Sequence, residues 1–371
     1  MNFDKNTIIG FVLLMILLFG YIFVTNQQQA AYMKEKHIKD SIANAGKPQK
    51  IISPEQKKSK DVSSSLAKDS LKKEMLSTSS LPEQLTFIEN DLMKVAFTNK
   101  GGYPKYIEIK SQKDVSGKPV VLGGNTHQLS YSLKTKAGQL INSSEVDYAV
   151  ELKGNSGSDV QEIIYSISDS SGKLIEHAFS INKDEYLIKW DIRSSASTLI
   201  PDQKIKLQWS MPVAQQEKDL KYEKGQSNIG YFENGEYDFD ASGTGDSRTL
   251  GSKTQWIGIK QQFFNATVIA PNNFSQVKTE WTVPGEEADS LRQVMNVKSL
   301  LELNIGSTSS FSVPLQLYFG PNDYHILKKY GMKLESHVQL GYGIFAFVKY
   351  INRFVIMPVF DFLHNHMASV G

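Results

Sequence analysis

Cysteine is absent from all 371 residues of the chain. Its absence excludes disulfides, thiolate zinc sites and a thiol nucleophile. An excess of one charge is also missing, because 41 basic and 39 acidic residues leave a formal net charge of +2. A protein that binds nucleic acid would show a concentrated basic face, so nucleic acid is not an expected partner.

Recognisable catalytic and cofactor motifs are lacking as well. The sequence has no Gly-rich phosphate loop, no Gly-x-Ser-x-Gly turn and no His-Glu-x-x-His pair. One acidic stretch could suggest calcium, but its spacing does not match a calcium-binding loop. We interpret it as a solvated hairpin that carries Glu233, Glu236, Asp238, Asp240 and Asp246. We therefore predict no catalytic residue, no cofactor and no metal site, and a protein that is not an enzyme.

One long hydrophobic run is present near the start of the chain. Ile8–Val24 contains thirteen residues that are Ile, Leu, Phe or Val, and no charged residue lies between Asn6 and Met33. As a helix the run spans about 25 Å, and each of these residues favours the bilayer by roughly 0.3–0.6 kcal/mol. A cleaved signal peptide is the alternative, but the run is long for one and no Ala-x-Ala site follows it. We predict a transmembrane anchor within residues 1–29, with side chains in the membrane at Ile8, Phe11, Leu14, Leu18 and Val24.

Residues 30–83 contain few side chains that could build a core. Between 30 and 80 there are eleven Lys, six acidic residues and no Phe or Trp. This composition buries too little apolar surface to offset the entropy of ordering. We predict a flexible polar linker, and its lysines could also contact anionic lipid headgroups.

From residue 84 to 320 apolar and polar residues alternate with period two. In Lys204–Ser210, for example, Ile205, Leu207 and Trp209 share one face. Turn signals such as Asn234–Gly235 separate at least fifteen such segments. The pattern is typical of antiparallel strands with one buried face. We predict a mainly β domain, a large two-sheet antiparallel β-supersandwich, in which a ligand cleft on one face is possible.

The domain contains two histidines, His127 and His177, and we predict that neither is catalytic. His177 shares strand parity with Ile175 and Phe179, so we interpret it as a core residue. His127 follows Gly123–Gly124, and we interpret it as a loop residue. The stretch Gln255–Ala270 (QWIGIKQQFFNATVIA) is interpreted as a well-buried pair of strands.

The pattern changes again over residues 321–371. Asn322 or Asp323 can cap a short helix that Gly331 ends. A second helix is predicted from about Ile344 to Leu363, with Pro358 kinking or splitting it. It is too charged to span a bilayer and too aromatic for an ordinary surface helix, so a position in the membrane interface is preferred over packing on the β domain. The residues that define this amphipathic helix are Phe347, Lys349, Ile351, Arg353, Phe354 and Phe362.

Taken in this order, the segments resemble the YidC-type membrane protein insertase family of Gram-negative bacteria. NTIIGFVLLMILLFG resembles the first transmembrane segment of that family, and VAFTNKGGYPKYIEIK resembles the start of its periplasmic domain. QWIGIKQQFFNATVIA is similar to a Trp-x-x-x-x-Gln-Gln-aromatic strand motif of the family. LYFGPNDYHILKKYG and QLGYGIFAFVKYINRFVIMPVF resemble the passage from that domain into an amphipathic helix. The resemblance covers almost the whole chain and is weakest in the linker.

The resemblance implies a protein of the bacterial inner membrane with its β domain in the periplasm. It implies membrane lipid and client membrane proteins as partners, and the Sec translocon as a further candidate. In the family a five-helix core with a transmembrane arginine carries out insertion, and this sequence is expected to end before that core. Arg353 is therefore not equated with that arginine.

Two other functions remain open at this point. A large β-sandwich also resembles the carbohydrate-binding domains of mutarotase-like enzymes, but ring opening needs a facing general acid and base. The third possibility is a membrane-anchored periplasmic adaptor or chaperone that works without any further domain.

Overall fold

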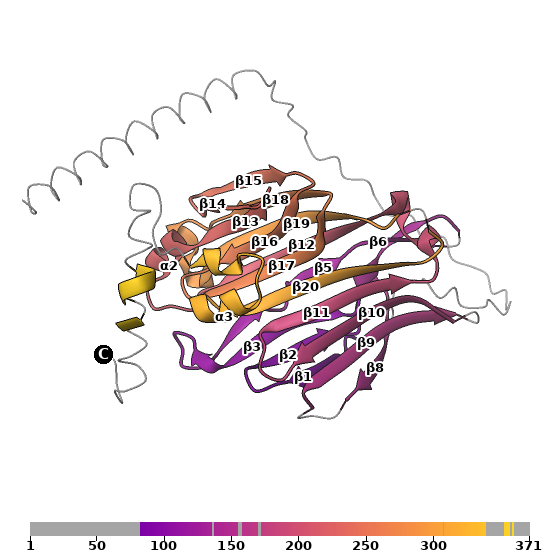
Figure 1. The fold of residues 1–371 in the computed structure, drawn as a ribbon, viewed down its shortest axis with the longest axis horizontal. Helices are drawn as coiled ribbons and strands as arrows, with labels where there is room; N and C mark the ends of the chain where they lie inside the picture. The colour runs from indigo at the N-terminus through magenta and orange to yellow at the C-terminus, as the bar shows by residue number, and fades with distance from the viewer. Residues whose placement is uncertain are drawn as a thin grey trace, which may run out of the picture. The chain divides into compact units, whose positions relative to one another are not determined.

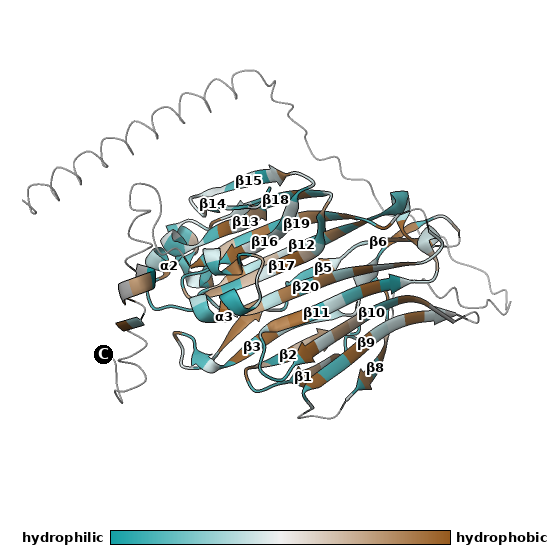
Figure 2. Cartoon of the chain, viewed as in Figure 1, coloured by the Kyte–Doolittle hydropathy of each residue, from teal (hydrophilic) through white to brown (hydrophobic). Residues whose placement is uncertain are grey.

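In the part of the chain that the structure describes, the alternation of apolar and polar residues produces twenty strands, and every strand pairing is antiparallel (Figures 1 and 2). The structure, a computed structural model, describes residues 82–338, apart from 136, 155–157, 170–171 and 307, together with 352–356 and 358–359. The strands form sheets of nine, five, four and two strands. The mainly β fold with antiparallel sheets is thus confirmed.

The largest sheet forms one layer and can be followed from β14 at the top of Figure 1 to β8 at the bottom. In spatial order its strands are β14 (Glu236–Ala241), β13 (Asn228–Glu233), β16 (Thr254–Lys260), β17 (Phe264–Phe274), β20 (Phe311–Pro321), β11 (Leu187–Ser194), β10 (Gly172–Asn182), β9 (Val160–Asp169) and β8 (Ala149–Lys153).

Two sheets make up the opposite layer. The five-stranded sheet contains β15 (Gly245–Leu250), β18 (Gln276–Thr282), β19 (Gln293–Asn304), β12 (Lys204–Ala214) and β5 (Gln128–Ser130). The four-stranded sheet contains β1 (Leu85–Glu89), β2 (Met93–Thr98), β3 (Tyr103–Lys113) and β4 (Pro119–Gly123). It lies beside the five-stranded sheet, since β4 contacts β12 and β3 contacts β5. A small hairpin of β6 (Ser132–Lys134) and β7 (Leu140–Asn142) completes the set.

The core lies between these layers. Phe97 of β2 packs on Phe179 of β10 with ring centroids 5.0 Å apart. Trp209 of β12 is buried and, through His127, reaches Phe319 of β20. The predicted inward faces are confirmed, because alternate residues of β11, β12 and β18 are buried. The two-layer prediction is correct, with the difference that hydrogen bonding divides one layer into two sheets.

Short connections contain the few helical elements. They are the α-helices α2 (Leu220–Gln226) and α3 (Tyr324–Lys329), the 3-10 helices η1 (Ser143–Glu145), η2 (Ser197–Leu199), η3 (Pro201–Gln203), η4 (Glu286–Leu291) and η5 (Leu334–His337), and the π-helix η7 (Asn352–Ile356). Asp323 caps α3 by accepting a hydrogen bond from the Ile326 backbone N–H, as predicted. No helix within the described ranges is long and apolar enough to cross a membrane.

Candidate functional site

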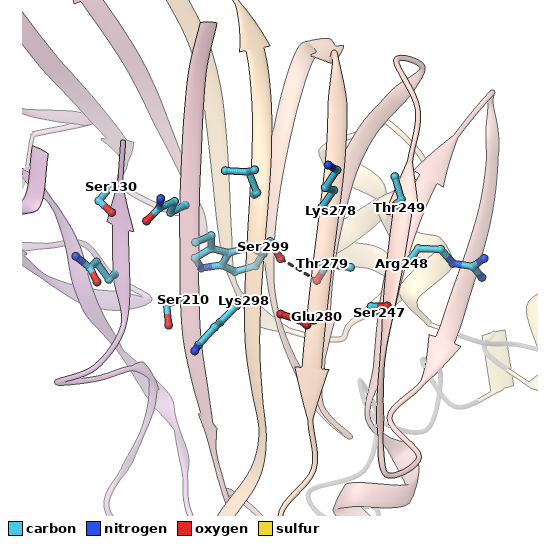
Figure 3. A pocket seen from close by; sticks show the side chains of 14 residues that line it. Ser130, Ser210, Ser247, Arg248, Thr249, Lys278, Thr279, Glu280, Lys298 and Ser299 are labelled. Carbon is cyan, nitrogen blue, oxygen red and sulfur yellow. Dashed lines mark hydrogen bonds between the residues drawn. The ribbon is translucent and has the colours of Figure 1, made fainter. Parts of the chain in front are cut away.

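A polar groove runs over the outer face of the five-stranded sheet (Figure 3). It consists of two adjoining cavities with volumes of about 610 and 820 Å³. Both cavities are lined by Ser210, Ser247, Glu280 and Lys298. These side chains come from β12, β15, β18 and β19, so the groove crosses strands that are far apart in the chain.

Strand register places the groove residues in two rows across the sheet. Each row takes one residue from each of the five strands, and successive members are direct cross-strand partners. The first row, from β5 to β15, is Ser130, Gln208, Leu300, Lys278 and Thr249. The second row is Gln128, Ser210, Lys298, Glu280 and Ser247. Neighbouring strands lie about 4.8 Å apart, so each row presents a polar group at nearly every such step.

The same alternation that builds the core creates this polar face. On β12, Trp209 points into the core while Gln208 and Ser210 point outward, because successive side chains of a strand alternate between faces. Beneath the groove the hydroxyl of Ser299 donates to Thr279 Oγ1 at 2.9 Å, and both side chains are buried. Figure 3 shows this bond between the two strands that carry Lys298 and Glu280.

Three charged groups of the groove, Lys278, Glu280 and Lys298, remain available for a ligand. Lys298 and Glu280 are direct cross-strand partners, yet within the described ranges neither of them nor Lys278 forms an ion pair. Arg248 points away from the groove (Figure 3) and instead binds Asp240 of β14 through two hydrogen bonds of 2.7 Å. The groove therefore offers hydroxyls, amides and charges of both signs, with Leu300 and Pro212 as its outward-facing apolar residues.

His127 lies in the loop before β5, as predicted, and its side chain is buried under the groove. Its Nδ1–H donates to the Lys105 carbonyl at 3.0 Å, and its Nε2 accepts from Trp209 Nε1–H at 3.2 Å. Burial lowers the pKa of His127 to about 4, so the ring is neutral at pH 7. The position after Gly123–Gly124 was predicted correctly, but the sequence carried no sign that the loop folds inward.

His177 is buried in the core, as predicted. The hydroxyl of Tyr131 lies 2.7 Å from His177 Nε2, and His177 Nδ1–H donates to the Gly102 carbonyl at 2.8 Å. Burial lowers the pKa of His177 to about 4. Both histidines therefore have structural hydrogen-bonding roles, and neither faces the groove.

Comparison with known proteins gives the family. The model of the YidC periplasmic domain matches residues 86–352. The chain belongs to the YidC periplasmic domain family.

Curated relatives agree with this assignment, and some solved structures show a lower similarity. Membrane protein insertase YidC of Parabacteroides distasonis is 26% identical over 393 residues, covering 99% of this chain and 60% of that protein. A crystal structure of an active YidC insertase with its first transmembrane domain resolved is 12% identical, with a TM-score of 0.38, covering 78% of this chain and 52% of that one. A galactose mutarotase-like protein from Lactobacillus casei is 9% identical, with a TM-score of 0.39, covering 64% of this chain and 100% of that one. The chain spans about three fifths of the length of the curated relatives it matches.

In this YidC periplasmic domain the Gln-Gln motif closes the turn between β16 and β17. Gln261 is buried and its amide donates to Glu223 Oε1 at 2.9 Å and to the Ala214 carbonyl at 2.8 Å. Burial raises the pKa of Glu223. The prediction of a well-buried strand pair is confirmed, although Phe263 at the turn is 52% exposed.

The acidic stretch that was predicted as a hairpin forms the antiparallel pair of β13 and β14, except that Asp246 lies beyond it in β15. Asp240 is engaged by Arg248, and Glu233 accepts hydrogen bonds from Gly251 and Thr254. Within the described ranges no group of three His, Cys, Asp or Glu side chains could hold a metal ion.

The predicted membrane-contacting residues are described only in part. Those outside the described residues are Ile8, Phe11, Leu14, Leu18, Val24, Phe347, Lys349, Ile351 and Phe362. Arg353 and Phe354 lie in the π-helix, where Phe354 is 66% exposed and the Arg353 guanidinium is 5.5 Å from its ring centroid.

Two features escaped the sequence analysis. The groove depends on which strands become neighbours, and alternation alone does not reveal that. The second feature is His337, which is fully buried against β16. Its sequence signal was the pair of glycines inside strands, Gly230 and Gly258, since glycine in a strand often marks a close approach.

Proposed function

We propose that this chain is the N-terminal portion of a membrane protein insertase, which assists the insertion and folding of membrane proteins in the bacterial inner membrane. The family match over residues 86–352 carries this proposal, and the curated relatives named Membrane protein insertase YidC support it over a mutarotase-like function. In the proposal residues 1–29 anchor the chain, residues 30–83 tether the domain, and residues 84–320 stand in the periplasm.

The amphipathic segment near the end of the chain lies in the membrane interface in this proposal. Its aromatic and aliphatic side chains contact acyl chains, while Lys349 and Arg353 remain among the headgroups. The exposure of Phe354 and of Ile356, at 54%, supports this placement. Lipid is therefore one proposed partner.

The groove binds a polar, extended segment of a client chain. A membrane protein offers an insertase two kinds of segment, the apolar span and the polar part that crosses to the far side. Leu300 and Pro212 are the apolar residues among the outward side chains of the groove, so it has little surface for an apolar span. Its hydroxyls, amides and charges of both signs match a polar chain that has left bulk water. The Sec translocon is a second candidate partner of the domain.

In this proposal the groove binds and positions the client segment and carries out no covalent chemistry. Epimerisation of a sugar would need a general acid and base facing each other. Of the histidines within the described ranges, none lines the groove, and both histidines beneath or behind it are held neutral in hydrogen bonds.

Site-specific photocrosslinking tests this proposal. A photoreactive amino acid replaces Ser210 in the 371-residue chain, and cells also produce a tagged membrane protein with a polar translocated segment. We expect a crosslinked product with that client, because Ser210 lies at the junction of the two groove cavities.

The matched control places the same amino acid at Ser180 of β10. Ser180 lines a separate depression of about 340 Å³ on the outer face of the nine-stranded sheet. We expect little crosslinking there. Equal yields at both positions, or none at Ser210, would contradict client binding in the groove.

A further inference from the structure

A short arm carries the chain away from the β domain on the outer side of the nine-stranded sheet. We define this exit arm as residues 330–338, between α3 and the end of the described domain. The hydroxyl of Tyr330 accepts a hydrogen bond from the Tyr186 N–H at 2.9 Å, and Trp256 Nε1–H donates to the Met332 carbonyl at 2.9 Å. Leu334 and His337 are fully buried. The arm is therefore attached at several points over β11 and β16.

The His337 ring occupies a space that two glycines leave open. Gly230 of β13 and Gly258 of β16 are direct cross-strand partners, and we call the gap between their backbones the glycine notch. A Cβ added to Gly258 would lie 2.6 Å from His337 Cε1, and one added to Gly230 would lie 2.9 Å from the same atom. Any larger residue at either position would collide with the ring.

Trp256 packs against the other side of the ring. The two ring centroids are 4.7 Å apart and the planes are inclined by 36°. Trp256 is itself fully buried. The Trp-x-Gly part of the family motif thus forms both the wall and the gap that receive His337.

The hydrogen bonds determine which protonation state fits the notch. The Thr267 hydroxyl donates to Asn265 Oδ1 at 2.8 Å, so its oxygen accepts from His337 Nε2–H at 3.2 Å. His337 Nδ1 is buried and has no hydrogen-bond partner within the described ranges. A proton at Nδ1 would place a positive charge in a buried site, with no acceptor for it among the described residues.

The groups that face His337 also disfavour a positive charge. Tyr237 of β14 approaches with a ring centroid distance of 6.0 Å, and Lys260 of β16 is the charged group nearby. Burial, and secondarily Lys260, lowers the pKa of His337 to about 3. The neutral ring fits the notch, and the imidazolium does not.

We propose that His337 is a latch that holds the exit arm in the glycine notch while its imidazole is neutral and releases the arm when the imidazole is protonated. While the latch is closed, residues 330–338 stay on the outer face of the nine-stranded sheet. Acid medium frees this arm without unfolding the sheets. The proposal does not depend on client binding in the groove.

The direction of the pH dependence follows from linkage. When the arm is released, the pKa of His337 has its ordinary value of 6.5. Docking of the arm is therefore strongest above pH 6.5 and weakens as the pH falls toward about 3, the pKa of the docked ring. At pH 5 the docking equilibrium should be about 25-fold less favourable than at pH 7.

Hydrogen–deuterium exchange of the full 371-residue chain in lipid nanodiscs tests the latch. Wild type and His337→Gln are compared at equal pH, at 7.5 and at 5.0, so that the intrinsic pH dependence of exchange cancels. At pH 5.0 we expect the amides of residues 324–338 to be at least tenfold less protected from exchange in wild type than in His337→Gln. The variant keeps a neutral side chain and should show no such response.

The matched control is His325→Gln, since His325 is an exposed histidine on α3, just before the arm. It should behave as wild type. A wild-type pH response in His337→Gln would overturn the proposal.

A second variant covers the case in which His337→Gln disturbs the arm by itself. Gly258→Ala fills the notch and should deprotect residues 324–338 already at pH 7.5, while amides of β10 and β12 remain protected. An arm that stays protected in Gly258→Ala would also overturn the proposal. Crosslinking at Ser210 serves as an independent readout, because it reports on the groove and not on the latch.

Discussion

Buried histidines in this domain serve as neutral hydrogen-bonding groups that join separate segments. His127 joins the β3 segment to β12, and His177 joins Gly102 to Tyr131. In each case one ring nitrogen donates to a carbonyl and the other accepts. Only the neutral imidazole has one donor and one acceptor nitrogen, since both nitrogens of the imidazolium donate. Burial and hydrogen bonding therefore both favour the neutral ring.

Removal of the Tyr131 hydroxyl tests this at the scale of one residue. In Tyr131→Phe, His177 Nε2 loses its donor in a buried site. We expect the free energy of unfolding to fall by about 1–3 kcal/mol, as is usual for an unpaired buried polar group. Urea unfolding of the full chain in detergent, followed by tryptophan fluorescence, measures the change.

Tyr222→Phe is the control for this measurement, because Tyr222 is 54% exposed on α2. Its effect should stay within about 0.5 kcal/mol. Equal effects of the two substitutions would show that the Tyr131 hydroxyl contributes nothing specific.

Single strands and hairpins were predictable, while the groove and the exit arm were not. Alternation identifies a strand because one face is buried, so β12 and β18 could be recognised with their inward tryptophans. The Asn234–Gly235 turn was recognisable because a type I′ hairpin needs positive φ at both central residues, as Asn234 and Gly235 have here. The order of strands depends instead on contacts between distant segments, such as Ser130 with Gln208. Sequence periodicity carries no information on such contacts.

The β13–β14 hairpin provides a test at the scale of an element. Gly235 has a φ of 84°, and a Cβ added there would meet nothing within 4 Å. Gly235→Ala should therefore destabilise the protein by about 1 kcal/mol through backbone strain alone. The free energy of unfolding in urea is again the measurement.

Gly225→Ala is the matched control, since a Cβ at Gly225 also meets nothing but its backbone is helical within α2. There alanine should be neutral or stabilising, by up to about 1 kcal/mol. If both substitutions changed stability in the same direction, strain at Gly235 would not be the cause.

For the whole molecule, the two layers place opposite chemistry on their inner and outer faces. Aromatic side chains and neutral histidines fill the interior, while the outer face of the five-stranded sheet carries the polar groove. The exit arm covers part of the other outer face. A domain built in this way can bind through one layer and connect to the following chain through the other.

The buried histidines also give the whole domain a predictable dependence on pH. The pKa values of His127 and His177 lie at about 4 in the folded state, against 6.5 for an exposed histidine. The unfolded chain therefore binds more protons below pH 6.5, and stability falls as the pH decreases from there toward 4. At pH 5 each histidine should lower the free energy of unfolding by about 2 kcal/mol relative to pH 7, and the two together by about 4 kcal/mol.

The raised pKa of Glu223 acts in the opposite direction, because its protonation is easier in the folded state. The substitution Glu223→Gln removes this opposing contribution. Urea unfolding at pH 7 and pH 5 should therefore show a larger loss of stability for this variant than for wild type. Unchanged stability of both proteins between these pH values would mean that the two histidines are not held neutral in the core.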